Sequence, residues 1–112
     1  MNNITIIEHP NLVRAVSARE LHDFLEIETP FHIWIERMLE YGFENGLDYV
    51  LNKNVQNLKP LGGRPSKDYF LTIECAKEIS MLQRTEKGKE ARKYFIECER
   101  KLKEQVLIVI FF

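Results

Sequence analysis

The sequence has few of the residues from which disulfide, metal and catalytic sites are built. It contains two cysteines and three histidines among 112 residues. The cysteines, Cys75 and Cys98, form no Cys-x-x-Cys motif, and the histidines show neither His-x-x-x-His nor His-Glu-x-x-His spacing. A disulfide framework and a zinc site are therefore not expected. Both cysteines are expected to remain thiols in a reducing compartment, by default the cytoplasm.

Long apolar runs and nucleotide-binding loops are missing as well. No stretch approaches the roughly 18 apolar residues of a membrane span, and residues 1–10 lack the basic and apolar regions of a signal peptide. The segment Leu61–Ser66 contains two glycines but not the Gly-x-x-x-x-Gly-Lys-Ser/Thr spacing of a phosphate loop. We therefore expect no membrane attachment, small-molecule substrate, cofactor, metal or catalytic residue, and the protein is not expected to be an enzyme.

What the chain does have is the composition of one small folded domain. Hydrophobic residues make up 45% and charged residues 29%, proportions that exclude wholesale disorder. The net charge of -1 hides an uneven distribution, because residues 1–52 carry nine acidic and three basic side chains whereas residues 53–112 carry eight acidic and thirteen basic ones. The second half can therefore present a basic surface.

Start signals followed by apolar residues at helical spacing predict four helices. They run from about Ala18 to Leu25, from Pro30 to a stop signal at Gly42, from Ile73 to about Arg84, and from Glu86 to about Glu104. The predicted caps are Ser17, Thr29, Thr72 and Thr85. Ser17 is followed by Glu20 at the spacing of a capping box.

The last two predicted helices each have an apolar face that should point inward. The inward positions are Cys75, Ala76, Ile79 and Leu82 in the third helix and Gly88, Ala91, Tyr94, Phe95, Cys98 and Leu102 in the fourth. On the outer face of the fourth helix, Glu97/Lys101 and Glu99/Lys103 stand four residues apart and are expected to form ion pairs.

Two short segments with strand composition lie between the second and third predicted helices. Asp48–Leu51 and Asp68–Leu71 are expected to pair as a β-hairpin, and Val55–Leu58 is a candidate for additional strand. The connection 52–67 is much longer than a usual hairpin loop, and long loops often carry function. The fold class is therefore α+β, mostly helical with about four helices and a β-hairpin wing, like a small winged-helix domain.

The end of the sequence is uniformly apolar. It consists of Val106, Leu107, Ile108, Val109, Ile110, Phe111 and Phe112. These residues favour β structure and would be poorly solvated as a free tail. We expect an extended segment that pairs with the same segment of a second chain in a homodimer; pairing with Ile4–Ile7 or with the hairpin is the alternative, as is a remnant of truncation.

Basic residues gather in two places that suit an anionic partner. The first group, on the long connection, is Lys59, Arg64 and Lys67; the second, around the start of the fourth helix, is Arg84, Lys87, Lys89, Arg92 and Lys93. Both groups are candidates for contacting nucleic-acid phosphates or a partner protein. The alternatives are a solvated hairpin tip and a helix face solvated by lysines.

Five sequence blocks resemble the AntA/AntB family of phage antirepressors. They are Val16–His22, Phe31–Arg37, Tyr41–Tyr49, Gly63–Tyr69 and Glu86–Arg100. The resemblance divides the chain into an N-terminal segment 1–15 in which a short strand is possible, an AntA/AntB-like domain 16–104, and the apolar tail 105–112.

The resemblance implies a phage or prophage module that relieves transcriptional repression. It leaves the direct target open, because repression is lifted either by noncovalent binding to a repressor protein or by competition at double-stranded DNA. The first is our main hypothesis. The alternative is a DNA-binding regulator that uses the basic wing and the start of the fourth helix.

Overall fold

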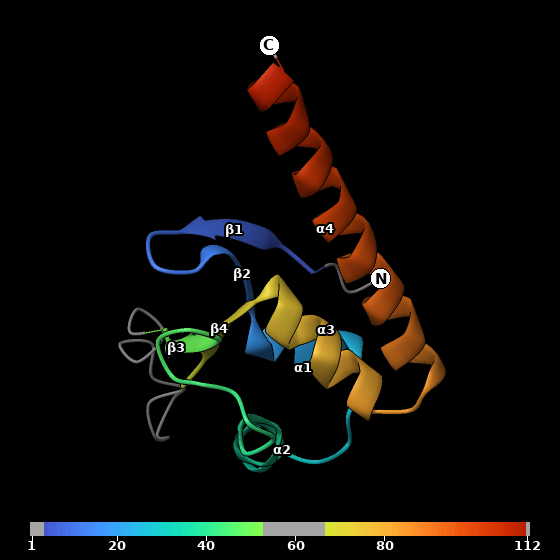
Figure 1. Ribbon diagram of the computed structural model, residues 1–112. Helices are drawn as coiled ribbons and strands as arrows, with labels where there is room; N and C mark the ends of the chain where they lie inside the picture. The colour runs from blue at the N-terminus through green and yellow to red at the C-terminus, as the bar shows by residue number, and fades with distance from the viewer. Residues whose placement is uncertain (1–3, 53–66, 112) are drawn as a thin grey trace.

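The computed structural model describes residues 4–52 and 67–111, with side chains described as far as Glu104 (Figure 1). The elements in chain order are β1 (Ile6–His9), β2 (Val13–Ser17), α1 (Ala18–Phe24), α2 (Phe31–Leu39), β3 (Tyr49–Leu51), β4 (Tyr69–Thr72), α3 (Ile73–Leu82) and α4 (Glu86–Phe111). This arrangement confirms the predicted α+β class with four helices. The candidate strand Val55–Leu58 lies outside the described residues.

The strands form one antiparallel sheet in the order β1-β2-β4-β3. At its centre Val16 of β2 pairs with Leu71 of β4, and both side chains are fully buried. The predicted hairpin is confirmed, since β3 and β4 pair with Val50 opposite Phe70. The hairpin belongs to a larger sheet than expected, because β1 and β2 extend it beyond β4.

Strand β2 is the element that the sequence analysis missed. Val16 and Ser17 were expected to precede a helix, and they do, but they also end a strand. The two roles are compatible because an N-cap residue keeps an extended backbone, as Ser17 does with φ -71° and ψ 130°. Thr72 likewise ends β4 and caps α3, so both central strands run directly into helices.

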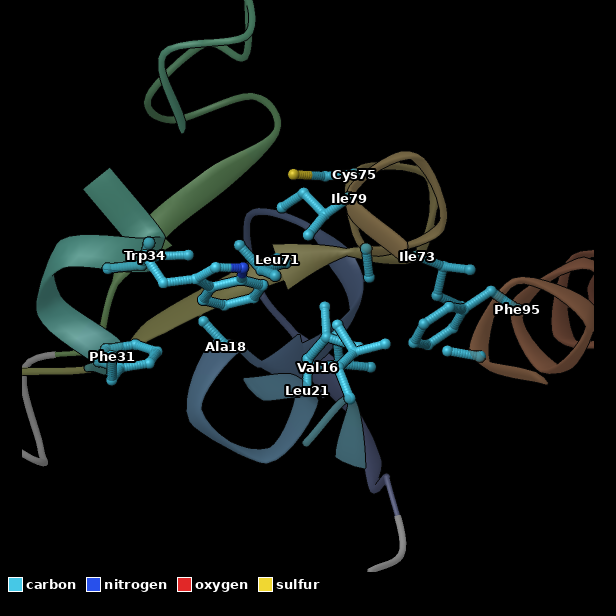
Figure 2. Close-up of a cluster of buried hydrophobic side chains, with 14 residues drawn as sticks. Val16, Ala18, Leu21, Phe31, Trp34, Leu71, Ile73, Cys75, Ile79 and Phe95 are labelled. Atoms are coloured by element: carbon cyan, nitrogen blue, oxygen red, sulfur yellow. The ribbon is translucent and has the colours of Figure 1, made fainter. Parts of the chain in front are cut away.

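The core lies between the sheet and the helices (Figure 2). Leu71 and Val16 occupy its middle, Trp34 approaches from α2, and Phe95 approaches from α4 on the opposite side. Ile79 of α3 is also fully buried. Side chains from all four helices therefore share one core with the sheet.

Three of the four predicted caps are confirmed. Ser17 Oγ accepts from the Glu20 amide at 3.3 Å, Thr72 Oγ1 accepts from the Cys75 amide at 3.1 Å, and Thr85 Oγ1 accepts from the Gly88 amide at 3.1 Å. Each hydroxyl satisfies an amide that has no carbonyl partner within its helix.

Both ends of α2 differ from the prediction. The N-cap is Pro30 rather than Thr29, because the Pro30 carbonyl accepts the Trp34 amide at 3.0 Å and so closes the first turn. At the other end, the amides of Glu40 and Tyr41 donate to carbonyls three residues earlier. This tightened turn ends the helix at Leu39, before the predicted stop, and Gly42 follows with φ +103°.

The expectation of an extended C-terminal segment is wrong, because α4 is helical as far as Phe111. Adding a residue to an existing helix gains a hydrogen bond without a new nucleation cost, and this outweighs the β preference of residues 106–111. The segment therefore forms no strand with Ile4–Ile7 or with the hairpin. Figure 1 shows the far end of α4 extending away from the sheet and the other helices.

Two residues predicted to face inward are substantially exposed. Leu82 at the end of α3 is 40% exposed, and Tyr94 of α4 is 42% exposed. The Tyr94 hydroxyl donates to the Ile4 carbonyl at 3.3 Å, so this ring lies along the chain that leads into β1. Among the α4 side chains that the structure describes, Ala91 and Phe95 are fully buried, so the inward face is narrower than predicted.

The acidic residues of α4 do not pair with the lysines four positions further on. Glu99 instead contacts Lys77 of α3 at 2.9 Å, and Glu97 contacts Arg100 at 3.1 Å. The neighbouring helix α3 brings Lys77 close to Glu99, which sequence spacing along α4 alone could not indicate. The first pair links α3 to α4.

The helices α3 and α4 approach each other closely at Gly88. A Cβ atom at this position would lie 2.5 Å from the Ser80 carbonyl oxygen, well inside van der Waals contact. The clashing atom belongs to the backbone of α3, so it cannot rotate away as a side chain could. Gly88 therefore allows α3 and α4 to pack closer together than any residue with a side chain would at this position.

We predict that Gly88→Ala destabilises the protein by about 1–3 kcal/mol, because it forces α3 and α4 apart. In an unobstructed helix the same change would stabilise by about 1 kcal/mol through helix propensity, so the sign is diagnostic. Urea unfolding measures the difference, with Lys93→Ala on the exposed side of α4 as control. A Gly88→Ala variant as stable as the parent would contradict the close contact.

Candidate recognition surface

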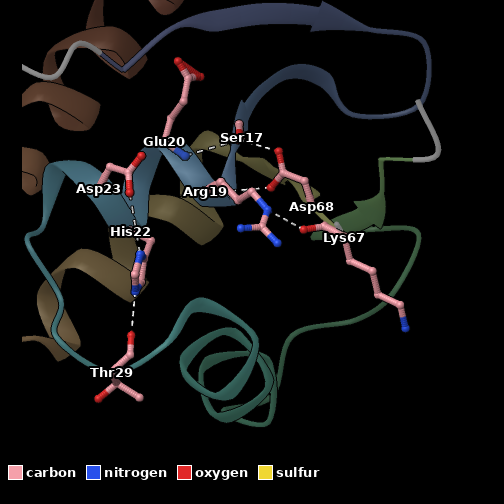
Figure 3. Close-up of polar contacts among 8 residues, drawn as sticks. All are labelled: Ser17, Arg19, Glu20, His22, Asp23, Thr29, Lys67 and Asp68. Atoms are coloured by element: carbon pink, nitrogen blue, oxygen red, sulfur yellow. Dashed lines mark hydrogen bonds and ion pairs between the residues drawn. The ribbon is translucent and has the colours of Figure 1, made fainter. Parts of the chain in front are cut away.

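A buried carboxylate connects the start of α1 to the start of β4 (Figure 3). Asp68 is 4% exposed. Its Oδ2 accepts from the Ser17 hydroxyl at 2.5 Å, and its Oδ1 accepts from the amides of Arg19 at 3.0 Å and of Tyr69 at 2.7 Å. The carboxylate thus accepts hydrogen bonds at the N-terminus of α1, where the helix dipole favours a negative charge.

Two further hydrogen bonds hold the two ends of the long connection, at Asn52 and Lys67. The Asn52 amide donates to the Asp68 carbonyl at 2.9 Å, and Arg19 Nε donates to the Lys67 carbonyl at 2.6 Å. The Arg19 guanidinium lies 4.2 Å from the centre of the Phe31 ring. Sequence reasoning missed Asp68 and Arg19 as organising residues; the available signal was a single acid at the beginning of a strand.

Of the first predicted basic group, the structure describes Lys67 alone, since Lys59 and Arg64 lie outside the described residues. The Lys67 side chain is exposed and points away from Asp68, as Figure 3 shows. The Arg19 contact fixes its backbone rather than its ammonium group.

The second predicted basic group is divided by the structure. Arg84, Lys89 and Arg92 line one surface hollow, with a volume of about 270 Å³, that we call the cationic hollow. Arg84 lies between α3 and α4 in a left-handed conformation, with φ +54°. The uncharged walls of the hollow are Ser80, Met81, Thr85 and Gly88.

The two other members of this group do not line the cationic hollow. Lys87 Nζ lies 3.7 Å from Glu90 and 5.3 Å from the centre of the Phe24 ring, so its charge is already engaged. Lys93 is exposed elsewhere on α4. Successive residues of an α-helix are rotated by about 100° around its axis, so side chains that are close in sequence point in different directions.

Arg92 has an unsatisfied polar atom. Its Nε is buried, and among the described residues it is the one buried side-chain nitrogen or oxygen without a hydrogen-bond partner. A buried donor without a partner costs about 1–3 kcal/mol. The described residues also form no ion pair with Arg84, Lys89 or Arg92 within 4.0 Å.

An apolar hollow adjoins the cationic one. It has a volume of about 260 Å³ and is lined by Tyr41, Phe43, Glu78, Met81 and Leu82. Met81 lines both hollows, so the two share a wall. Tyr41 is 63% exposed and Met81 50% exposed. The sequence analysis did not identify this surface, because its residues come from α3 and from the turn after α2.

A third hollow separates the β1–β2 turn from α4. Its volume is about 490 Å³, and its lining includes Pro10, Val13 and Leu102. Val13 is 68% exposed and has φ +68°, a conformation that costs energy for a β-branched residue. The charged residues Glu8 and Arg14 also reach this hollow, so its electrostatic character is mixed.

The thiols are poorly suited to nucleophilic chemistry. Burial raises the pKa of the Cys75 thiol far above its usual range, and the nearby carboxylate of Asp48 raises it further. Burial also raises the pKa of Cys98, although the Tyr94 hydrogen bond and Lys101 act in the opposite direction. A raised pKa leaves less reactive thiolate at neutral pH.

Neither a metal site nor a membrane helix is found in the part of the chain that the structure describes. Within it, no three or more His, Cys, Asp or Glu residues gather closely enough to hold a metal ion. Within the same residues, no helix combines the length and the apolar character that crossing a membrane requires.

The sequence matches a known protein family. Residues 16–85, more than half of the chain, match the sequence model of the AntA/AntB antirepressor family. The chain belongs to this family. No curated protein and no solved structure matches it significantly.

The AntA/AntB match runs from the last two residues of β2 through α3 and therefore includes Asp68, the apolar hollow and Arg84. It contains the first four sequence blocks that resembled the family. The fifth block, Glu86–Arg100, lies in α4 beyond the matched range, so the resemblance of this block to the family stays a prediction. An AntA/AntB antirepressor is a regulatory protein rather than a catalytic one.

We predict that Asp68→Ala destabilises this AntA/AntB domain by about 2–3 kcal/mol, because the Ser17 hydroxyl and the Arg19 amide lose their buried acceptor. Asp68→Asn retains one acceptor oxygen and should cost about half as much. Thermal or urea unfolding measures both, with Glu28→Ala at an exposed position as control. Equal stability of Asp68→Ala and the parent would show that the network contributes nothing.

Proposed function

We propose that this chain is the antirepressor module of a phage or prophage regulator and acts in the cytoplasm by binding a repressor protein noncovalently. The observation that carries the proposal is the AntA/AntB match over residues 16–85. The neighbouring apolar and cationic hollows support a protein target, because protein interfaces combine apolar contact with charged rims.

The expected outcome is that the purified chain releases a cognate repressor from operator DNA in proportion to its concentration. Fluorescence anisotropy of labelled operator measures the release, and calorimetry of chain and repressor measures the complex directly. A chain that forms no complex and leaves operator affinity unchanged would contradict the proposal.

Direct DNA binding is the second candidate, favoured by the basic residues Lys59, Arg64 and Lys67 together with those of the cationic hollow. Each phosphate contact would add about -0.9 to the slope of log affinity against log salt concentration. Duplex binding by the chain alone, weakened by Arg64→Glu/Lys67→Glu and steeply dependent on salt, would favour this candidate over the repressor complex.

We also propose that the module is a homodimer joined through residues 106–112. Every residue in this range is apolar, and the end of α4 extends away from the sheet and the other helices (Figure 1). An apolar helix end is stable in water when another apolar surface covers it. The same segment of a second copy provides such a surface.

Deleting Val106–Phe112 should therefore convert a dimer into a monomer while leaving the helical signal of the remaining domain in place. Small-angle scattering and light scattering of the two proteins measure their masses. A monodisperse monomer both with and without the segment would contradict dimerisation through α4.

A further inference from the structure

The apolar and cationic hollows form one surface at the junction of α3 and α4. We call this surface the α3–α4 face and define it by Tyr41, Met81, Leu82, Arg84, Lys89 and Arg92. Met81 belongs to both hollows, so a ligand in either hollow contacts this side chain. We infer that the α3–α4 face binds an acidic amphipathic segment of a protein; that this protein is the repressor rests on the proposed function.

The apolar part of the face consists of large side chains that are exposed to solvent. Tyr41 is 63%, Met81 50% and Leu82 40% exposed, and all three line the apolar hollow. Leu82 and Met81 stand at the end of α3, next to the turn that carries Arg84. Large apolar side chains that are exposed together, rather than singly, mark an interaction site.

Among the described residues, the cations of the face lack the carboxylate partners that Lys77 of α3 and Lys87 and Arg100 of α4 have. Lys77 contacts Glu99, and Lys87 contacts Glu90, whereas no described carboxylate lies within ion-pair distance of Arg84, Lys89 or Arg92. The buried Nε of Arg92 also lacks an acceptor. A carboxylate in the cationic hollow would neutralise the charges of Arg84 and Lys89, whose side chains are exposed.

The position of Glu78 sets the direction of the ligand. Glu78 is exposed and lines the apolar hollow but not the cationic hollow. An acidic group bound beside Glu78 would be repelled, whereas one beside Arg84 would be attracted. The ligand should therefore place apolar side chains near Tyr41 and Leu82 and carboxylates near Arg84 and Lys89.

A protein segment fits this face better than a nucleic-acid backbone does. A phosphate backbone would satisfy the cations but would leave Met81 and Leu82 against a charged, strongly hydrated surface. An amphipathic segment covers apolar and charged groups at the same time. Methionine is flexible and polarisable, which suits contact with a partner side chain.

The test begins with a library of random twelve-residue peptides displayed on phage and selected on the immobilised full chain. The most enriched peptide is then synthesised with a fluorescent label, and its affinity for the full chain is measured by anisotropy. The expected sequences combine aspartate or glutamate with leucine or aromatic residues. Enrichment of peptides without acidic residues, or no enrichment at all, would overturn the inference.

Two variants assign the bound peptide to the face. Arg84→Glu/Lys89→Glu should weaken binding at least about tenfold, and Met81→Ser should weaken it about fivefold. The matched controls Lys101→Glu/Lys103→Glu and Leu47→Ser change equivalent groups at exposed positions outside the face and should change affinity less than about twofold. Circular dichroism verifies that all variants keep their helices.

Equal loss in the control variants would overturn the inference, as would unchanged binding by Arg84→Glu/Lys89→Glu. So would a duplex DNA that binds at the face and depends on its cations but not on Met81. Repressor release separates this inference from the proposed function. If Arg84→Glu/Lys89→Glu releases the repressor as well as the control Lys101→Glu/Lys103→Glu does, the inference about the face is wrong and the proposed function stands. If acidic peptides bind the face but no repressor is released, the function fails.

Discussion

The packing of α3 against α4 at Gly88 positions the surface to which we assign recognition. Because no side chain separates Gly88 from the Ser80 carbonyl, the start of α4 lies directly against α3. The buried side chain of Phe95 continues this contact into the core beside the central strands. Arg84 lies in the short turn between the two helices. Lys89 and Arg92 follow it in α4 and are therefore held next to the exposed apolar end of α3.

The sheet supplies the second constraint on the same domain. Both central strands run directly into helices, and Asp68 accepts hydrogen bonds from the start of α1 while its own strand leads to α3. The positions of α1 and α3 are therefore linked through a buried carboxylate and a strand pair rather than through helix contacts alone. A recognition surface built on α3 is consequently supported from both sides, by the sheet and by α4.

Local signals predicted the elements that depend on neighbouring residues, and failed where distant parts of the chain meet. The hydroxyl caps at Ser17, Thr72 and Thr85 followed from sequence spacing because each acts within one helical turn. The Asp68 network joins residues about fifty positions apart, so no local pattern indicated it. The basic residues around α4 were recognised as a group, but their division between faces, and the apolar hollow beside them, required the arrangement of α2, α3 and α4.

Native-state hydrogen exchange tests most directly whether the recognition surface is a fixed part of the fold. If the α3–α4 contact holds as described, the amides of α3 and those of α4 from Glu90 to Phe95 should exchange as slowly as those of β2 and β4, through unfolding of the whole domain. Exchange of these α4 amides many times faster than that of α3, in the intact protein, would contradict the account, since the cations would then have no fixed position beside the apolar hollow.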